Sequence, residues 1–264
     1  MSIYHKESPH YLDRAISSLL KQTKPPSEIV IVLDGPVGPD LENVLARYFS
    51  ASCIQIKPVH LKKNMGLGIA LREGLDACVF PIVARMDADD VALPDRFEKQ
   101  LAFLEAHPDI DLVGGWIGEF SRNEKSYDTI RKVPDSMEEI VRFAKYRNPI
   151  NHMTVMFRKK SVQRAGGYRH FPGFEDYGLW VRMIRNGAYL ANLPEVLVAA
   201  RTGDAMIRRR RGWEYARREW RFQRWMKEVG FLSSVEMYRN LSLRVPPRLL
   251  PGSLVQRVYS ALRK

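Results

Sequence analysis

Cysteine is scarce in this sequence of 264 residues, which contains only Cys53 and Cys78. Neither thiol has a histidine or a second cysteine nearby at metal-binding spacing, so we expect two reduced, buried thiols in a cytoplasmic protein. Long apolar runs are absent too, since none approaches the roughly 18 residues that span a bilayer. The start of the chain has no export-signal pattern. These absences argue against a disulfide-rich secreted protein and against a membrane-spanning one.

Two glycine-rich patterns that would indicate other enzymes are also missing. The glycines within residues 64–68 lack the spacing of a dinucleotide-binding fingerprint, which argues against a nicotinamide-dependent oxidoreductase. Residues 5–10 read His-Lys-Glu-Ser-Pro-His, whereas a sugar nucleotidyltransferase normally has a glycine-rich loop directly after its first strand. That enzyme stays open as an alternative, because it would also use acidic residues and a metal on an α/β sheet.

Acidic residues are scarce in one part of the chain only. Residues 1–200 carry 26 basic and 25 acidic side chains, whereas residues 201–264 carry 16 basic and 5 acidic side chains. Nearly all of the net charge of +12 therefore lies in the last quarter of the chain. Such a segment attracts phosphate, whether in nucleic acid, in an anionic membrane or in a pyrophosphate-linked lipid. A solvated helical face is the simpler interpretation, and a nucleic-acid-binding protein is the non-enzyme alternative.

Short apolar runs alternate with helical patterns over the first two hundred residues, which predicts a mainly parallel α/β sheet flanked by helices. A short strand is expected at residues 2–4, and further strands are expected at residues 29–33, 54–61, 82–86, 111–114, 154–158, 188–193 and 196–201. The helices are expected at residues 11–22, 40–50, 64–78, 94–107, 137–146 and 175–186. We predict a catalytic domain over residues 1–205 and a basic helical extension over residues 206–264.

The extension combines aromatic and basic residues. From Trp213 to Val229 the apolar residues recur at roughly helical spacing, and arginines and a lysine fill the gaps. This combination is typical of a helix that lies on an anionic membrane surface. The alternative is that the aromatic residues pack against the catalytic domain while the arginines face water.

Carboxylates follow two of the predicted strands. Residues 84–90 read Ala-Arg-Met-Asp-Ala-Asp-Asp, at the carboxyl end of a strand, where open α/β sheets bind ligands. In extended backbone Asp87 and Asp89 point the same way, so they can share a hard cation such as Mg²⁺ or Mn²⁺. An acidic turn that caps the next helix is the alternative. Asp34 ends the strand 29–33 at the same edge and can accept hydrogen bonds from a nucleobase or ribose, or merely occupy a turn.

Two further segments combine polar residues with the start of a helix. Residues 64–68, Asn-Met-Gly-Leu-Gly, place small residues at a helix N-terminus, where free N–H groups favour anions. In residues 173–180, the adjacent carboxylates of Glu175 and Asp176 lead into a helix between aromatic side chains. They could supply a general base beside aromatic platforms, or they could only complement the helix dipole.

Taken in order, these motifs resemble the family-2 glycosyltransferases of the A-type fold, which is Rossmann-like. The likeness is strongest to the branch that builds exopolysaccharide and O-antigen chains, including amylovoran-type enzymes. It extends over about residues 2–211. It depends on residues 2–4, 29–35, 64–68, 84–90, 94–97, 148–158, 166–168, 174–180 and 192–194.

The resemblance implies a role for each matching residue. Contacts to the donor nucleotide are expected from Tyr4, Asp34, Asn64, Gly66, Asp87 and Asp89. Asp89 would ligate Mn²⁺ or Mg²⁺ with Asp87 beside it. Asp176 matches the general base, and Glu175 would orient it. The acceptor side is expected to include Trp180, Asn151 and His152.

The resemblance also implies an activity and its partners. The enzyme would move a sugar from a nucleotide-diphosphate donor to a saccharide acceptor, lipid-linked in this branch, with inversion at the anomeric carbon. Peripheral contact with the inner face of the cytoplasmic membrane would follow, and nucleic acid would not be a partner. The sequence departs from the family in three places: the first strand is short, the turn at residues 33–35 reads Leu-Asp-Gly where many members have two acidic residues, and Arg208–Arg211 is unusually basic.

Overall fold

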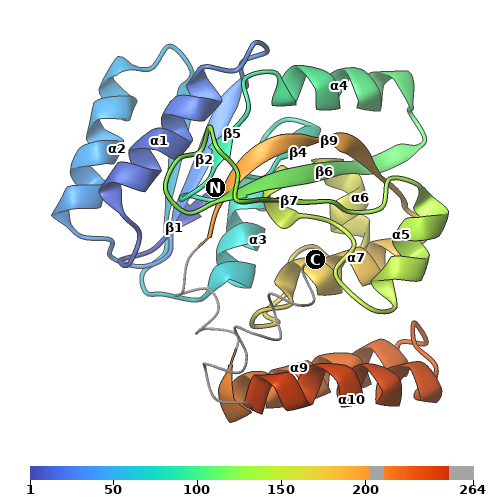
Figure 1. Cartoon of the computed structure of the whole chain (residues 1–264). Helices are drawn as coiled ribbons and strands as arrows, with labels where there is room; N and C mark the ends of the chain where they lie inside the picture. The colour runs from blue at the N-terminus through green and yellow to red at the C-terminus, as the bar shows by residue number, and fades with distance from the viewer. Residues whose placement is uncertain (203–210, 250–264) are drawn as a thin grey trace. The chain divides into compact units, whose positions relative to one another are not determined.

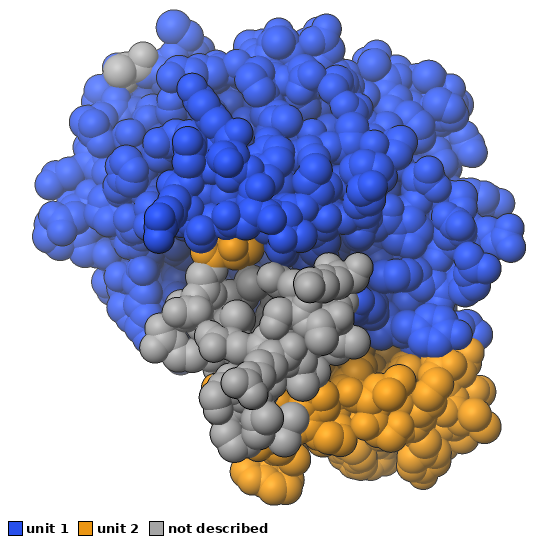
Figure 2. Space-filling view, viewed as in Figure 1, with its two compact units in different colours: residues 1–201 blue, residues 202–264 orange. Residues whose placement is uncertain are grey.

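The structure, a computed structural model, describes residues 1–202 and 211–249 (Figure 1). The chain divides into two compact units, Met1–Arg201 and Thr202–Lys264, which Figure 2 colours separately. The predicted boundary between residues 205 and 206 lies outside the described residues. No helix in the described ranges is both long enough and apolar enough to cross a membrane.

The first unit begins with a three-stranded parallel sheet in the order β1-β2-β3. Its strands are β1 (Ser2–Ile3), β2 (Glu28–Leu33) and β3 (Gln55–His60). They alternate with the helices α1 (Pro9–Leu20), α2 (Pro39–Ala51) and α3 (Leu67–Ala77). Five of the six residues of β2 are buried, as expected for an apolar strand inside a parallel sheet. This alternation brings the carboxyl ends of β1 and β2 to one edge.

The second sheet contains six strands in the order β4-β8-β6-β9-β5, with β7 paired to β6. They are β4 (Ile82–Ala84), β5 (Val91–Ala92), β6 (Ile110–Phe120), β7 (Thr129–Arg131), β8 (Met156–Arg158) and β9 (Tyr189–Arg201). Only β6 and β9 run parallel, and the other pairs are antiparallel. The α/β class is therefore confirmed, but this sheet is mixed rather than mainly parallel.

Strand β9 corrects a second expectation. Two strands are predicted on either side of Pro194, whereas one strand runs from Tyr189 to Arg201. Its pairing with β6 is irregular next to Gly115 and Trp116. Such an irregularity lets a strand continue past a residue that cannot donate a ladder hydrogen bond.

Helices surround this sheet in Figure 1: α4 (Arg96–Ala106), α5 (Met137–Ala144), α6 (Lys159–Arg164) and α7 (Glu175–Arg185). A single 3₁₀ turn, η1 (His152–Thr154), precedes β8. The helix α6 was not expected from the sequence. It follows β8 directly, so its short apolar pattern merges with that of the strand.

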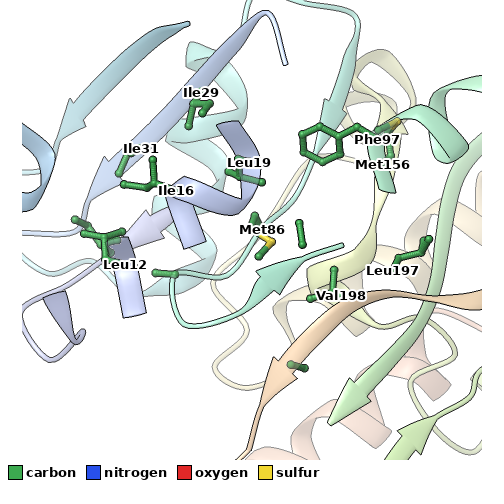
Figure 3. Close-up of a cluster of buried hydrophobic side chains, with 14 of the residues drawn as sticks. Leu12, Ile16, Leu19, Ile29, Ile31, Met86, Phe97, Met156, Leu197 and Val198 are labelled. Carbon is green, nitrogen blue, oxygen red and sulfur yellow. The ribbon is translucent and has the colours of Figure 1, made fainter. Parts of the chain in front are cut away.

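A continuous apolar core joins the two sheets. Figure 3 shows side chains of α1 and β2 in one cluster with Met86, which follows β4, and with side chains of α4 and the second sheet. The labelled residues are Leu12, Ile16, Leu19, Ile29, Ile31, Met86, Phe97, Met156, Leu197 and Val198. Each fully buried side chain of this size contributes about 1.5–3 kcal/mol. Packing rather than strand pairing therefore holds the sheets together.

The backbone at Met1 lies in this junction. Strand β1 pairs only with Val32 and Leu33, and beside the rest of β2 lies a mostly apolar cavity of about 350 Å³ lined by residues of β2, α3 and β4. The α-ammonium of Met1 donates a hydrogen bond to the carbonyl of Val30 at 3.0 Å. Burial, with the charge of Arg85 adding to it, lowers the pKa of this amine to about 5.

The two cysteines are free, but they are not both buried as expected. Cys53 is exposed and Cys78 is partly buried. Cys53 lies between the end of α2 and the start of β3, outside both apolar faces.

The described part of the second unit is a pair of helices, α9 (Gly212–Glu228) and α10 (Ser234–Leu249). Helix α9 covers the segment predicted to be helical. Glu219 is fully buried, and its carboxylate lies 3.1 Å from the guanidinium of Arg244. Gln223 donates to Glu219 and accepts from Asn240, at 3.2 and 3.0 Å. This polar layer fixes the register of the two helices, because any slip would leave buried groups unpaired.

Candidate active site

The acidic segment 87–90 lies just beyond β4, which ends at Ala84 rather than at Met86 as predicted. Arg85 is only 4% exposed, and its guanidinium donates to Oδ1 of Asp87. Burial opposes ionisation of Asp87, but the charges of Arg85 and His152 outweigh it and hold the pKa of this carboxyl below its usual value. Asp87 is therefore a carboxylate at neutral pH. It and Asp89 are both partly exposed.

The side chain of Asp90 points into the protein and stabilises the fold. It is buried, and its Oδ1 accepts a hydrogen bond from the backbone N–H of Arg201 at 2.8 Å. Burial, together with the negative charges of Asp87 and Asp89, raises the pKa of Asp90 well above its ordinary value. The three carboxylates thus divide into one that ties the segment to β9 and two that remain accessible.

A buried arginine supports this segment from below. Arg96 is fully buried and donates through Nη2 to the carbonyl of Arg85 at 2.8 Å and through Nε to Oε1 of Gln100 at 3.0 Å. Gln100 in turn donates to the carbonyls of Val113 and Thr154 at 2.9 and 2.8 Å. Burial lowers the pKa of Arg96 to about 9, which still leaves it charged at neutral pH. The end of β4 is therefore held by α4, β6 and η1.

Asp34 lies at the end of β2, at the same level of the parallel sheet as Tyr4 after β1. Its two carboxylate oxygens accept hydrogen bonds from the backbone N–H groups of Met65 and Gly66 at 2.6 and 3.0 Å. The amide of Asn64 donates to the backbone carbonyl of Asp34 at 3.3 Å. Asp34 is only 5% exposed, and its carboxylate is engaged in hydrogen bonds that hold the loop before α3. The surface it offers to a nucleobase is small.

Glycine at position 68 lets this loop meet the segment before α7. A Cβ at Gly68 would lie 2.3 Å from the carbonyl oxygen of Arg169 and 3.1 Å from Cγ of Glu175, closer than van der Waals contact allows. Glu175 accepts a hydrogen bond from the backbone N–H of Gly173 at 2.9 Å. The predicted anion-binding loop and the predicted general-base segment are therefore neighbours.

Asp176 begins α7 beside the loop that contains Asn148. The side-chain amide of Asn148 donates to Oδ2 of Asp176 at 2.6 Å, and both side chains are partly buried. Nearby, Nε2 of His152 lies 3.1 Å from the hydroxyl of Tyr168. Burial and the charge of Arg85 lower the pKa of His152 to about 4, while the charges of Asp176 and Asp87 act in the opposite direction. The charges of Asp87 and Asp176 thus both favour protonation of the same imidazole.

The three expected acceptor residues do not share one environment. Trp180 is fully buried in the core beneath α7, so its indole has no surface on which a sugar could stack. Asn151 is also buried, and its amide donates to the carbonyl of Gly115 at 2.9 Å. Both side chains belong to the support of the site in this structure. His152 remains next to the carboxylates.

Sequence reasoning missed three polar residues of this region: Arg85, Arg96 and Asn148. Each lies inside a motif that carried the family resemblance, yet none was given a task. The available signal was chemical, because an arginine inside or just after an apolar run must find a partner when it is buried.

A divalent cation fits the residues that are present. Among residues 1–202 and 211–249, no three His, Cys, Asp or Glu side chains cluster closely enough to hold a metal ion by themselves. Mg²⁺ is typically bound through one or two carboxylates, with substrate phosphates supplying further oxygens. Asp89 and Asp87 offer that donor set, and one oxygen of Asp87 is occupied by Arg85.

Known structures share this fold. The chain superposes on *Staphylococcus aureus* TarS residues 1–349 in complex with UDP-GlcNAc with a TM-score of 0.63 at 18% identity, over 84% of this chain and 64% of the other. It superposes on the mannosyltransferase PcManGT from *Pyrobaculum calidifontis* in complex with GDP-Man and Mn²⁺ with a TM-score of 0.62 at 15% identity, over 92% and 68%. The fold is therefore that of the A-type glycosyltransferases.

The chain belongs to glycosyl transferase family 2, whose family model matches residues 1–164. It is 41% identical over 267 residues to the amylovoran biosynthesis glycosyltransferase AmsE of *Erwinia amylovora*, over 100% of this chain and 98% of that protein. It is 36% identical over 259 residues to an *Escherichia coli* UDP-Gal:α-D-GlcNAc-diphosphoundecaprenol β-1,3-galactosyltransferase, over 98% and 93%. Membership decides against the nucleotidyltransferase and nucleic-acid-binding alternatives. The protein is a glycosyltransferase.

Proposed function

We propose that this enzyme transfers a sugar from a nucleotide-diphosphate donor to a saccharide acceptor carried on a lipid diphosphate, with inversion, in polysaccharide biosynthesis. The observation that carries the proposal is the close approach of the loop before α3 to the start of α7, where a Cβ at Gly68 would lie 3.1 Å from Cγ of Glu175, the neighbour of Asp176. The names of the relatives support the pathway, since one acts in amylovoran biosynthesis and another on a diphosphoundecaprenol-linked sugar. The two solved neighbours, bound to UDP-GlcNAc and GDP-Man, support the donor class.

Inversion follows from a single displacement. Asp176 accepts the proton of the acceptor hydroxyl while that oxygen attacks the anomeric carbon, and the bond from this carbon to the diphosphate oxygen breaks on the opposite face. The nucleoside diphosphate leaves with the bonding electron pair. Asp87 and Asp89 would hold Mn²⁺ or Mg²⁺, and the bound ion supplies positive charge against the departing diphosphate. Placement of donor and acceptor in line for the displacement would supply much of the remaining acceleration.

Replacement of the general base tests the proposal directly. Asp176→Asn should lower kcat by about 10²- to 10⁴-fold, the contribution of a general base, and leave donor binding close to wild type. The measurement is nucleotide diphosphate release from a panel of nucleotide sugars, with donor binding followed by calorimetry. Asp109→Asn is the matched control, because Asp109 is exposed between α4 and β6.

Two results would contradict the assignment. A loss of turnover below tenfold in Asp176→Asn would make Asp176 a helix-terminal charge rather than a base. Retention of the donor's anomeric configuration in the product, measured by NMR, would rule out the single displacement whatever the mutant does.

The metal assignment has its own test. Asp89→Ala should abolish transfer and remove the increase in donor affinity that Mn²⁺ or Mg²⁺ gives the wild type, while circular dichroism stays unchanged. Donor affinity is measured with and without the ion in both proteins. Near-normal turnover of Asp89→Ala with either ion would remove Asp89 from the list of ligands.

An anionic membrane surface is the proposed partner of the second unit. Trp213 and Trp220 of α9 are 79% and 45% exposed. Arg217 and Arg224 lie at the same helical spacing, and the guanidinium of Arg224 stacks over the Trp220 ring at 5.5 Å. Aromatic rings beside arginines suit the interface between lipid headgroups and acyl chains. A lipid-linked acceptor would be presented at such a surface.

A further inference from the structure

We propose that Asn148 is a positioning residue for the transfer reaction, because its side-chain amide fixes the Asp176 carboxylate through one oxygen and leaves the other to take the acceptor proton. This inference rests on the proposed role of Asp176 as the base. The amide nitrogen of Asn148 lies 2.6 Å from Oδ2 of Asp176, a short distance for a hydrogen bond from nitrogen and typical of a charged acceptor. A carboxylate otherwise rotates freely about its terminal torsion, so this bond selects one orientation.

The loop that contains Asn148 is itself anchored. Asn192 of β9 donates to the carbonyl of Pro149 at 3.2 Å, and Asn151 donates to the carbonyl of Gly115 of β6 at 2.9 Å. Thr154 donates to the carbonyl of Asn151 at 2.7 Å. Contacts to β6 and β9 therefore hold the part of the loop that follows Asn148. The position of the amide is set by the sheet.

The other end of the contact is anchored as well. Tyr177, next to Asp176 in α7, is buried, and its hydroxyl donates to the carbonyl of Ala144 at the end of α5. Only a short connection separates Ala144 from Asn148. The helix that carries the base and the loop that carries the amide are thus joined twice, once by Tyr177 and once by Asn148.

The chemistry favours an amide at this position. A carboxamide donates hydrogen bonds but does not titrate, so it stabilises the carboxylate without holding a proton that would compete with the one removed from the acceptor. The charged and titratable groups around Asp176 are His152, Tyr168 and the adjacent Glu175. Because the carboxamide of Asn148 does not titrate, it remains a donor at every working pH.

The test exchanges the donor for an acceptor of the same shape. Asn148→Asp should lower kcat by about 10- to 100-fold, the effect of losing a hydrogen bond to a charged group, and should move the acidic limb of the kcat–pH profile to higher pH. The KM for the donor should stay within about twofold. Asn186→Asp, at the exposed end of the same helix α7, is the matched control and should change none of these quantities.

A second pair of variants separates positioning from a general structural effect. Asn148→Ala should lower kcat in the wild type but have little further effect in an Asp176→Asn background, because its action passes through Asp176. Equal losses in both backgrounds would overturn the inference, as would near-normal kcat and an unshifted pH profile in Asn148→Asp. Asn148→Ser carries the same test if the aspartate variant does not fold. Full activity of Asp176→Asn alone would instead overturn the proposed function.

Discussion

The pKa of His152 is affected by several charged residues of the site. Burial and Arg85 lower its pKa to about 4, and Asp87 and Asp176 only partly offset them. The imidazole is therefore neutral at pH 7. It can share one hydrogen bond with Tyr168, whose own pKa is raised by burial. A neutral imidazole adds no positive charge that would compete for the proposed base.

The shift predicts how stability depends on pH. The unfolded chain protonates this histidine near 6.5, and the folded protein only near 4, so the unfolded state binds more protons between these values. Stability should fall as pH decreases from about 6.5 to 4 and be independent of this group above 7. This histidine should change the free energy of unfolding by on the order of 2 kcal/mol between pH 7 and pH 4. The figure is lower than the full pKa difference would give, because the side chain is only partly buried and water screens its charge.

Urea unfolding of the wild type and of His152→Asn measures this effect. The difference in unfolding free energy between the two proteins should be constant above pH 7 and shift in favour of the variant as pH falls toward 4. A difference that does not change with pH, or an imidazole that titrates near 6.5 by NMR, would contradict the burial of His152.

Sequence could identify the acidic residues of the site but not the way they divide. Asp87, Asp89 and Asp90 form one run, and no pattern tells which of them turns inward; that depends on the backbone N–H of Arg201, 111 positions further along the chain. Asn148 was overlooked for the same reason, because its partner Asp176 lies on another element. Trp180 resembles a binding platform in sequence, but the hydrophobic face of α7 buries it.

At the scale of elements, the loop between β3 and α3 is stabilised by hydrogen bonds to a residue outside it, Asp34 at the end of β2. Asp34→Ala would leave the N–H groups of Met65 and Gly66 without their acceptor, a loss of about 1.5–3 kcal/mol per charge-assisted bond at most. We expect a lower melting temperature of the ligand-free protein together with weaker donor binding. Asp40→Ala, in the exposed first turn of α2, is the control.

This variant also decides what Asp34 does for the nucleotide. If Asp34 only contacts the nucleobase, donor affinity falls while the ligand-free protein melts at the wild-type temperature. If it holds the loop, both quantities fall together. Hydrogen exchange of the amides of Met65 and Gly66 distinguishes the two cases, since exchange should accelerate only in the second.

The elements that were well predicted have a simple physical basis. The β-branched run of β2 and the amphipathic pattern of α1 are set by local sequence, and both occur where expected. Strand direction is not local. Strands β4 and β8 are antiparallel because of the loops and helices between them, and two-residue strands such as β5 carry no periodicity at all. The mixed second sheet therefore could not be derived from runs of apolar residues.

At the scale of the whole molecule, the basic extension predicts a salt-sensitive attachment to lipid. The intact protein should float with vesicles of anionic phospholipid at low ionic strength and less so as salt is added, because each basic residue near the surface contributes on the order of 1 kcal/mol. Vesicles of zwitterionic lipid should not recruit it. The cluster Arg208–Arg211, also expected to contribute, lies outside the described residues except for Arg211.

Variants of α9 locate the attachment. Trp213→Ala combined with Trp220→Ala should reduce flotation strongly, since both rings are exposed. Phe49→Ala, which removes an exposed aromatic ring from α2, should not. Unchanged flotation of the double variant, or no flotation of the intact protein at low salt, would show that this face does not bind lipid.

The unequal exposure of the two cysteines has a practical consequence for anyone who labels this protein. A thiol-specific reagent reacts with the thiolate and needs access to the sulfur. Cys53 is exposed, whereas Cys78 is partly buried and burial raises the pKa of its thiol. A maleimide added near neutral pH should therefore attach to Cys53 first and react with Cys78 much more slowly until the protein unfolds.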